Sequence, residues 1–331
     1  MRFRLSILIQ LSVIFGCGQP DRPASNTEKT RPITPRIVVT SQPLLQMTQA
    51  IIGDTAEVTI VVPTDTSSRD WSPTADDARI MQQAGLILIS GAGYEPWKDR
   101  VSLPGSRVHD TAAGYYDELI RIPDAVTHQH GPDGPHSHPG TVWATWLDPE
   151  LCAAQLHQVS INCERLLPDR KQSIESAEAK FSAELNTLNS TIASIIAAAN
   201  DEPLVVFSDA PHYQYLVQRL GWTLRYVHWD AADTISEKNR TELLDAFKAH
   251  TSNRDPIFLM DSRRSPETEA LVRESGGIVV RIDLCESASP NSVSLPDRLK
   301  LNLLRLRDGI AEQFDSPGQE IKHSTPPLKL R

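Results

Sequence analysis

Four histidines stand within eleven residues of the chain, in the segment VTHQHGPDGPHSHPG of residues 126–140. Neutral imidazole nitrogens are ligands that suit zinc. Because glycine and proline interrupt the segment, we expect a solvated loop, in which His128 and His130 lie before the central turn and His136 and His138 after it. Ordering a flexible loop costs entropy, so we predict a weak metal-collecting site that loses affinity when the imidazoles are protonated. A loop whose histidines bind nothing is the alternative.

The remaining chain must supply the elements that position such groups. Short β-branched runs alternate with helical patterns in IVVT, AEVTIVVP, AGLILIS and SRVHD, and again in EPLVVFSD, TLRYVHW, DPIFLMD and GIVVRID. This alternation predicts an α/β fold with mostly parallel sheets. We expect two α/β lobes, residues 37–167 and 200–313, each large enough for a core of its own.

A long helical pattern at residues 168–199 separates the two sets of strands. Its apolar residues recur mostly at spacings of three and four, which is typical of an amphipathic helix. They are Ile174, Phe181, Leu185, Leu188, Ile192 and Ile195. We therefore predict one linking helix that runs along both lobes.

Both ends of the chain read as segments outside the folded part. Residues 1–16 combine Arg2 and Arg4 with a short apolar run, which predicts an export signal rather than a membrane-spanning helix. The signal ends at IFGC, which resembles a bacterial lipobox and makes Cys17 the expected lipidation site. Residues 17–36 then form a flexible tether and residues 314–331 a disordered tail. The expected location is the outer face of the cell membrane or the periplasm.

Composition and missing motifs exclude other classes of protein. The formal net charge of −9 argues against a nucleic-acid partner, which would need a basic face. Cys152 and Cys163 are expected on one helix, roughly 16 Å apart, which is beyond disulfide reach, whereas Cys285 could pair with either of them across the fold. The chain has no HExxH helix, GxSxG elbow or phosphate loop, so we do not expect an enzyme.

Several motifs in one order resemble the solute-binding proteins of zinc and manganese ABC transporters. They are GAGYEPW, the histidine-rich insertion, TWLDP, YQYLVQRLGW and the strand-end acid of VRIDLC, and the resemblance covers about residues 36–312. It implies a monomeric receptor that holds a transition-metal ion between its two lobes, zinc first and manganese next. It also implies an ABC permease and its ATPase as partners. Such proteins commonly use three histidines and one carboxylate as metal ligands.

The sequence departs from the family pattern at these ligand positions. The first family histidine corresponds to Arg69 or Asp70, the second to Ala144, and the third to Ala210 or Ser208. The family acid is retained as Asp283, and Asp261 ends a neighbouring strand. His212 and Asp209 lie close to the third position in the sequence.

Two interpretations remain open. In the first, the metal site is rebuilt from one or two of the loop histidines with Asp283, Asp261 and His212. In the second, the site between the lobes has lost its metal, and the protein has a different role, either with an anionic ligand or as a buffer for metal at the histidines. An arginine at position 69 would then pair with Asp283 or bind an anion.

Overall fold

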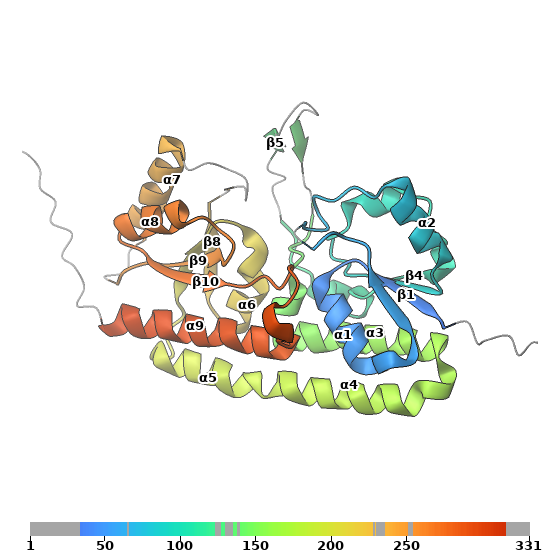
Figure 1. The fold of residues 1–331 in the computed structure, drawn as a ribbon. Coiled ribbons are helices and arrows are strands. Elements are labelled where there is room, and N and C mark those ends of the chain that lie inside the picture. Colours follow the sequence, from blue (N-terminus) through green and yellow to red (C-terminus); the bar gives the residue numbers. More distant parts are fainter. Residues whose placement is uncertain are drawn as a thin grey trace, which may run out of the picture. The chain divides into compact units, whose positions relative to one another are not determined.

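Two four-stranded parallel sheets form the framework of the chain (Figure 1). The computed structural model describes residues 34–64, 66–122, 127–129, 135–137, 140–227, 229, 236–250 and 254–315. The described residues belong to one compact unit. None of the helices in the described ranges has the length and apolarity to cross a membrane. The predicted α/β class with mostly parallel sheets is confirmed.

The first sheet has the strand order β2-β1-β3-β4. Its strands are β1 (Arg36–Val39), β2 (Glu57–Ile60), β3 (Leu86–Ile89) and β4 (Val108–Asp110). All four residues of β3 are buried, as expected for an apolar LILI run inside a parallel sheet. Helix α1 (Gln42–Ile52) begins where Ser41 accepts a hydrogen bond from the Leu44 amide, and α2 (Ala75–Gln83) begins with a capping box of Thr74 and Asp77.

The second sheet repeats this construction with the order β10-β9-β7-β8. Its strands are β7 (Val205–Ser208), β8 (Thr223–Tyr226), β9 (Ile257–Asp261) and β10 (Ile278–Ile282). The associated helices are α6 (Gln214–Arg219), α7 (Glu237–Lys248), α8 (Pro266–Glu274) and α9 (Leu295–Asp315). Helix α9 extends two residues beyond 313, and Arg254 lies 3.4 Å from the ring centroid of Phe314 in its last turn.

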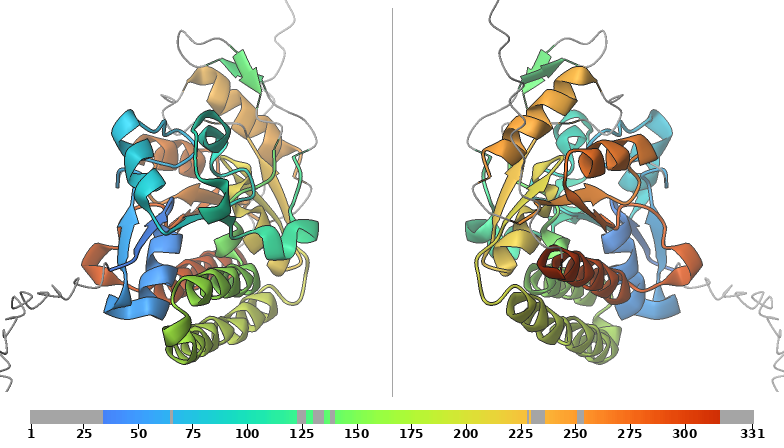
Figure 2. Two further views of the ribbon diagram at one scale, coloured as in Figure 1. Left: turned by 90° about the vertical axis from the view of Figure 1, so that its right-hand side faces the viewer. Right: turned by 90° about the vertical axis from the view of Figure 1, so that its left-hand side faces the viewer.

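Three helices connect the two sheets. Helix α3 (Pro149–Leu166) starts at Asp148, whose carboxylate accepts from the Glu150 amide, and Pro149 occupies the first turn where no amide hydrogen is needed. The expected linking helix consists of α4 (Lys171–Asn186) and α5 (Leu188–Ala198), which meet at Thr187 in helical conformation. In Figures 1 and 2, α4, α5 and α9 lie on the same side of both sheets.

Short elements complete the described chain. The antiparallel pair β5 (Thr127–Gln129) and β6 (Pro135–Ser137) lies within the histidine-rich segment. Short 3-10 helices occur at Gly53–Thr55, Pro96–Arg100, Gly105–Arg107, Ala113–Glu118, Thr145–Leu147, Pro168–Arg170, Pro211–Tyr213 and Pro290–Ser292.

One hydrophobic cluster continues from the first lobe into the second. It contains Leu44 and Trp146 from the first lobe, Ile174 and Leu188 from the linking helices, and Leu303 from α9. All of these side chains are at most 2% exposed. The two sheets therefore share a core through the helices rather than having wholly separate ones.

Candidate functional site between the lobes

Carboxylates collect where the strands of the second sheet end. Asp209 follows β7, Asp261 ends β9, and Asp283 follows β10. Because parallel strands end at the same edge of a sheet, these acids come from one side of the lobe, where ligands bind in open α/β sheets. The sequence correctly indicates Asp261 and Asp283 as strand-end acids, whereas it marks Asp209 only as a residue close to the third family position.

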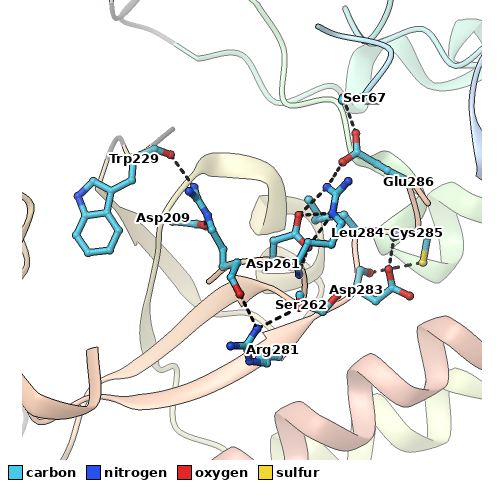
Figure 3. Close-up of polar contacts among 12 residues, drawn as sticks. Ser67, Asp209, Trp229, Asp261, Ser262, Arg281, Asp283, Leu284, Cys285 and Glu286 are labelled. Atoms are coloured by element: carbon cyan, nitrogen blue, oxygen red, sulfur yellow. Dashed lines mark hydrogen bonds and ion pairs between the residues drawn. The ribbon is translucent and has the colours of Figure 1, made fainter. Parts of the chain in front are cut away.

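Two consecutive arginines after β9 hold the first two carboxylates (Figure 3). The Arg264 Nε donates to Asp209 at 2.6 Å, and both side chains are nearly fully buried. The Arg263 guanidinium forms a fork on Asp261, with Nη2 at 2.6 Å and Nε at 2.9 Å from Oδ2. Burial raises the pKa of Asp209 to about 6, although the positive charge of Arg264 opposes this shift.

Glu286 connects the two lobes through hydrogen bonds. Its Oε1 accepts from the Tyr94 hydroxyl and from the Ser67 hydroxyl of the first lobe, each at 2.7 Å. Its Oε2 accepts from Arg263 Nη2 at 2.6 Å (Figure 3). Glu286 is only 7% exposed, so these contacts satisfy a buried charge. Burial and the neighbouring Glu286 raise the pKa of Tyr94 well above its usual value, which keeps the hydroxyl as a donor.

Aromatic rings form a wall beside these contacts. The ring centroids of Trp143 and Tyr94 are 4.8 Å apart, and those of Trp143 and His212 are 4.6 Å apart. Trp146 packs edge-on against Tyr94 and donates its indole N–H to the Leu284 carbonyl at 2.9 Å. Rings from both lobes therefore pack together at the interface.

His212 is partly buried against this wall, with its Nδ1 shielded from water, and remains neutral. Burial first, and then the positive charges of Arg69, Arg264 and Arg263, together lower its pKa to about 3. Its Nδ1 has no hydrogen-bond partner among the described residues.

Asp283 is engaged away from the other carboxylates. Both of its oxygens accept from Arg298 of α9, at 2.8 and 2.9 Å, and Oδ1 also accepts from the Cys285 amide. Burial acts to raise the pKa of Asp283, but the hydrogen bonds and charge of Arg298 hold it below its usual value. Of the two alternatives for Arg69, the pairing with Asp283 is wrong, because Arg298 binds both oxygens of that carboxylate.

Arg69 lies near this network but stays unpaired. No hydrogen bond or ion pair within the described part of the chain involves its guanidinium, while Asp70 beside it is exposed. Burial lowers the pKa of Arg69, against the opposing charges of Asp70, Tyr94 and Glu286. Arg69 therefore faces the interface without a partner of its own.

The histidine-rich segment is described only in part. The backbone pairs His128 with His136 directly across the β5–β6 ladder. His130 and His138 lie outside the described residues, as does the expected lipidation site Cys17. Within the described ranges, no group of three or more His, Cys, Asp or Glu side chains is arranged to hold a metal ion. The rebuilt metal site and the loop site both stay predictions.

The GAGYEPW motif builds the first lobe's side of the interface. Gly91, Ala92 and Gly93 all have positive φ, so the chain turns sharply after β3. Glu95 then folds back to accept from the amides of Ser90 and Gly91 and from the Thr40 hydroxyl. Burial raises the pKa of Glu95 to about 7. This turn places Tyr94 opposite Glu286.

Several residues of the site were not found from the sequence. The contact between the lobes is formed by Ser67 and Tyr94 with Glu286, which Arg263 also binds. These partners are distant from one another in the chain, so no local pattern reveals them. The only local signal is the pair Arg263-Arg264 directly after the strand-end acid Asp261. Two adjacent arginines at such a position indicate that nearby carboxylates need counter-charges.

Comparison with known proteins places this architecture in a family. The family model described as the periplasmic zinc-uptake complex component A matches residues 37–309. The chain belongs to this family. The resemblance inferred from the motifs is confirmed over nearly the same residues.

Individual relatives are distant. The chain is 22% identical over 183 residues to the zinc-binding lipoprotein AdcA of Streptococcus pneumoniae, which covers 54% of this chain and 36% of the relative. It therefore spans about a third of the length of AdcA. It is 21% identical over 314 residues to the high-affinity zinc uptake system protein ZnuA of Bacillus subtilis, covering 90% and 94% of the two chains.

A solved structure confirms the fold. FpvC of Pseudomonas aeruginosa, in complex with Mn²⁺, has a TM-score of 0.66 at 20% identity and covers 84% of this chain and 99% of its own. At this identity the likeness establishes the architecture alone. The two lobes joined by helices thus have a counterpart among solved structures.

Proposed function

We propose that this member of the zinc-uptake family is an exported receptor that captures a transition-metal ion and delivers it to an ABC permease driven by its ATPase. Zinc is the first candidate and manganese the second. The observation that carries the proposal is the family match over residues 37–309. The names of the relatives support zinc, since AdcA is a zinc-binding lipoprotein and ZnuA of Bacillus subtilis belongs to a zinc uptake system.

The charges between the lobes favour the histidine-rich segment, rather than the carboxylates, as the metal site. A metal ion at Asp261 or Asp283 would have to displace Arg263 or Arg298, each of which binds its carboxylate through a fork. A neutral imidazole has no charge that would attract a competing cation, and the backbone register of β5 and β6 sets His128 opposite His136. Imidazole ligands suit zinc better than manganese, which prefers oxygen.

Anchoring at the membrane surface completes the proposal. The lipobox-like IFGC supports lipidation of Cys17. Metabolic labelling with a fatty acid should mark the unchanged protein and leave Cys17→Ser unlabelled. Labelling of both proteins to the same extent would refute the anchor without touching the metal proposal.

The test is a titration of the metal-stripped protein with zinc and with manganese in the presence of a competing chelator. One variant replaces His128, His130, His136 and His138 with asparagine. Its control replaces His157 and His250, which lie outside the segment. We expect zinc binding in the unchanged protein and in the control, and its loss in the fourfold variant. Binding should weaken as the pH falls below about 6.5, where protons compete for imidazole.

Transport needs a separate measurement in cells. Zinc accumulation should fall when the gene is deleted and recover with the unchanged protein, but not with the fourfold variant. Equal zinc binding by all three purified proteins would refute the loop as the metal site. Normal accumulation in the deletion strain under zinc limitation would refute delivery.

A further inference from the structure

Arg69 differs from every other unpaired arginine of the described chain. The arginines that share its lack of a hydrogen-bond or ion-pair partner are all exposed to water, whereas Arg69 is partly buried at the interface between the lobes. These exposed residues are Arg100, Arg121, Arg170, Arg225 and Arg305. A guanidinium that leaves water without gaining an acceptor pays an uncompensated desolvation cost. Such a position calls for a negatively charged partner.

The neighbouring carboxylates are already committed to other groups. Glu286 accepts from Tyr94, Ser67 and Arg263, and Asp261 is held by the same Arg263. Asp209 is bound through Oδ2 by Arg264 at 2.6 Å, and although its Oδ1 has no partner, no hydrogen bond or ion pair joins it to Arg69. The charge of Glu286 acts on Arg69, yet the two side chains form no ion pair. An acceptor for Arg69 must therefore come from outside the described chain.

The second lobe offers a further unused polar atom near Arg69. His212 Nδ1 is buried without a hydrogen-bond partner, and the charge of Arg69 reaches its ring. A neutral imidazole can donate one hydrogen bond from a ring nitrogen. The His212 ring lies 4.6 Å from that of Trp143, so its orientation is fixed by packing.

The local charge favours an anion over a metal ion at this position. Arg69, Arg263 and Arg264 all act on His212 with positive charge. The positive potential of these three arginines disfavours a metal cation at the imidazole and favours a ligand with negatively charged oxygens. Arginine binds carboxylate and phosphate groups through two parallel hydrogen bonds, which lysine cannot match.

We propose that Arg69 and His212, one from each lobe, bind a small oxyanion, a carboxylate or a phosphate group, between the lobes. Arg69 supplies the charge and two N–H donors, and His212 supplies one neutral donor from Nδ1. Trp143 holds the imidazole in place. This site is independent of the metal proposed for the histidine-rich segment.

The experiment titrates metal-free full-length protein carrying Cys17→Ser with phosphate, sulfate, acetate and citrate at constant ionic strength. Binding is measured by calorimetry, with chloride as the reference. Arg69→Gln removes the charge, Arg69→Lys retains it without the fork, and His212→Phe removes Nδ1 while keeping a ring against Trp143. Arg100→Gln is the matched control, because Arg100 is an unpaired arginine of the same lobe exposed to water.

We expect at least one of these anions to bind with one-to-one stoichiometry. Arg69→Gln should weaken that binding by at least about tenfold, as expected for the loss of a charge-assisted hydrogen bond. Arg69→Lys and His212→Phe should weaken it by smaller factors, and Arg100→Gln should leave it unchanged. Preference for phosphate and sulfate or for acetate and citrate would identify the class of ligand.

Three results would overturn the proposal. The first is no binding of any of the four anions to the unchanged protein. The second is equal affinity of the unchanged protein and a folded Arg69→Gln variant, with folding checked by circular dichroism. The third is an equal loss in Arg100→Gln, which would reduce the effect to general charge. Zinc binding by the same metal-stripped protein, measured separately, tests the proposed function, and its result does not depend on whether an anion binds.

Discussion

The hydrogen bond from Tyr94 to Glu286 joins the two lobes at a buried position, and its strength can be measured. Tyr94 is 2% exposed and Glu286 7% exposed, and the distance from the hydroxyl to Oε1 is 2.7 Å. A hydrogen bond to a charged group contributes about 1.5–3 kcal/mol. We therefore expect Tyr94→Phe to lower the free energy of unfolding by about 2 kcal/mol. The Ser67 hydroxyl remains as a donor to the same oxygen.

A double-mutant cycle separates this bond from packing changes. Glu286→Gln removes the charged acceptor, so Tyr94→Phe in that background should cost less than about 1 kcal/mol. The coupling between the two substitutions is then about 1 kcal/mol or more. Urea unfolding followed by far-ultraviolet circular dichroism gives the four free energies. Tryptophan fluorescence is less suitable, because Tyr94 packs against Trp143 and Trp146.

Tyr116 supplies a matched control for the cycle. Its hydroxyl also donates to a carboxylate, Asp110 at 2.6 Å, but the residue is 53% exposed. Tyr116→Phe should cost no more than about 0.5 kcal/mol and should not couple to Glu286→Gln. Additive effects of Tyr94→Phe and Glu286→Gln, or an equal cost of Tyr116→Phe, would refute the contact as a stabilising link.

Three further predictions concern the first lobe and the thiols. The pKa of Glu95 rises from 4.5 to about 7 on folding, so its ionisation destabilises the folded state as the pH rises through this window. The free energy of unfolding of the unchanged protein, relative to that of Glu95→Gln, should therefore fall by about 2 kcal/mol between pH 5 and 8. A difference in urea unfolding that stays constant with pH would contradict this. Gly91→Ala should cost about 2 kcal/mol or more in the same assay, because φ is +75° and the added Cβ would overlap Asp110 Oδ1. Gly105→Ala, which meets nothing within 4 Å, should stay within about 0.5 kcal/mol, and equal costs would contradict the prediction. Cys152, Cys163 and Cys285 are buried free thiols with raised pKa values, so in Cys17→Ser they should react with a thiol reagent only after unfolding in urea; rapid labelling of the native protein would show that they are reachable.

The fold could be predicted because its signals are local. The eight strands of the two sheets coincide with short apolar runs, and the linking helices follow the spacing of Ile174 to Ile195. The boundary between α4 and α5 at Thr187 could not be predicted. Thr187 itself has helical φ and ψ, and no proline or glycine marks the position in the sequence. Periodicity reports which face of an element is buried, which is enough to set the class of fold.

The site was harder to predict because charge pairing depends on distant contacts. Asp283 was correctly placed at a strand end, but its partner Arg298 lies fifteen residues further on, across a turn and on α9. Glu286 lies 219 residues from Ser67 and 192 from Tyr94. No local pattern distinguishes a carboxylate that binds a ligand from one that binds an arginine. The identity of the partner is decided only by the packing of the two lobes.

The hydrophobic cluster that passes through both lobes has a consequence for how the molecule can be divided. Leu44, Ile174 and Leu303 belong to one continuous core, although they come from the first lobe, the linking helix and the last helix. A shortened chain that ends after α4 would lack α9, which contacts α1 and α4, and would expose apolar side chains of those two helices to water; such surfaces promote association. The lobes are therefore halves of one cooperative folding unit, and neither is suited to be transplanted alone into another protein as a binding module.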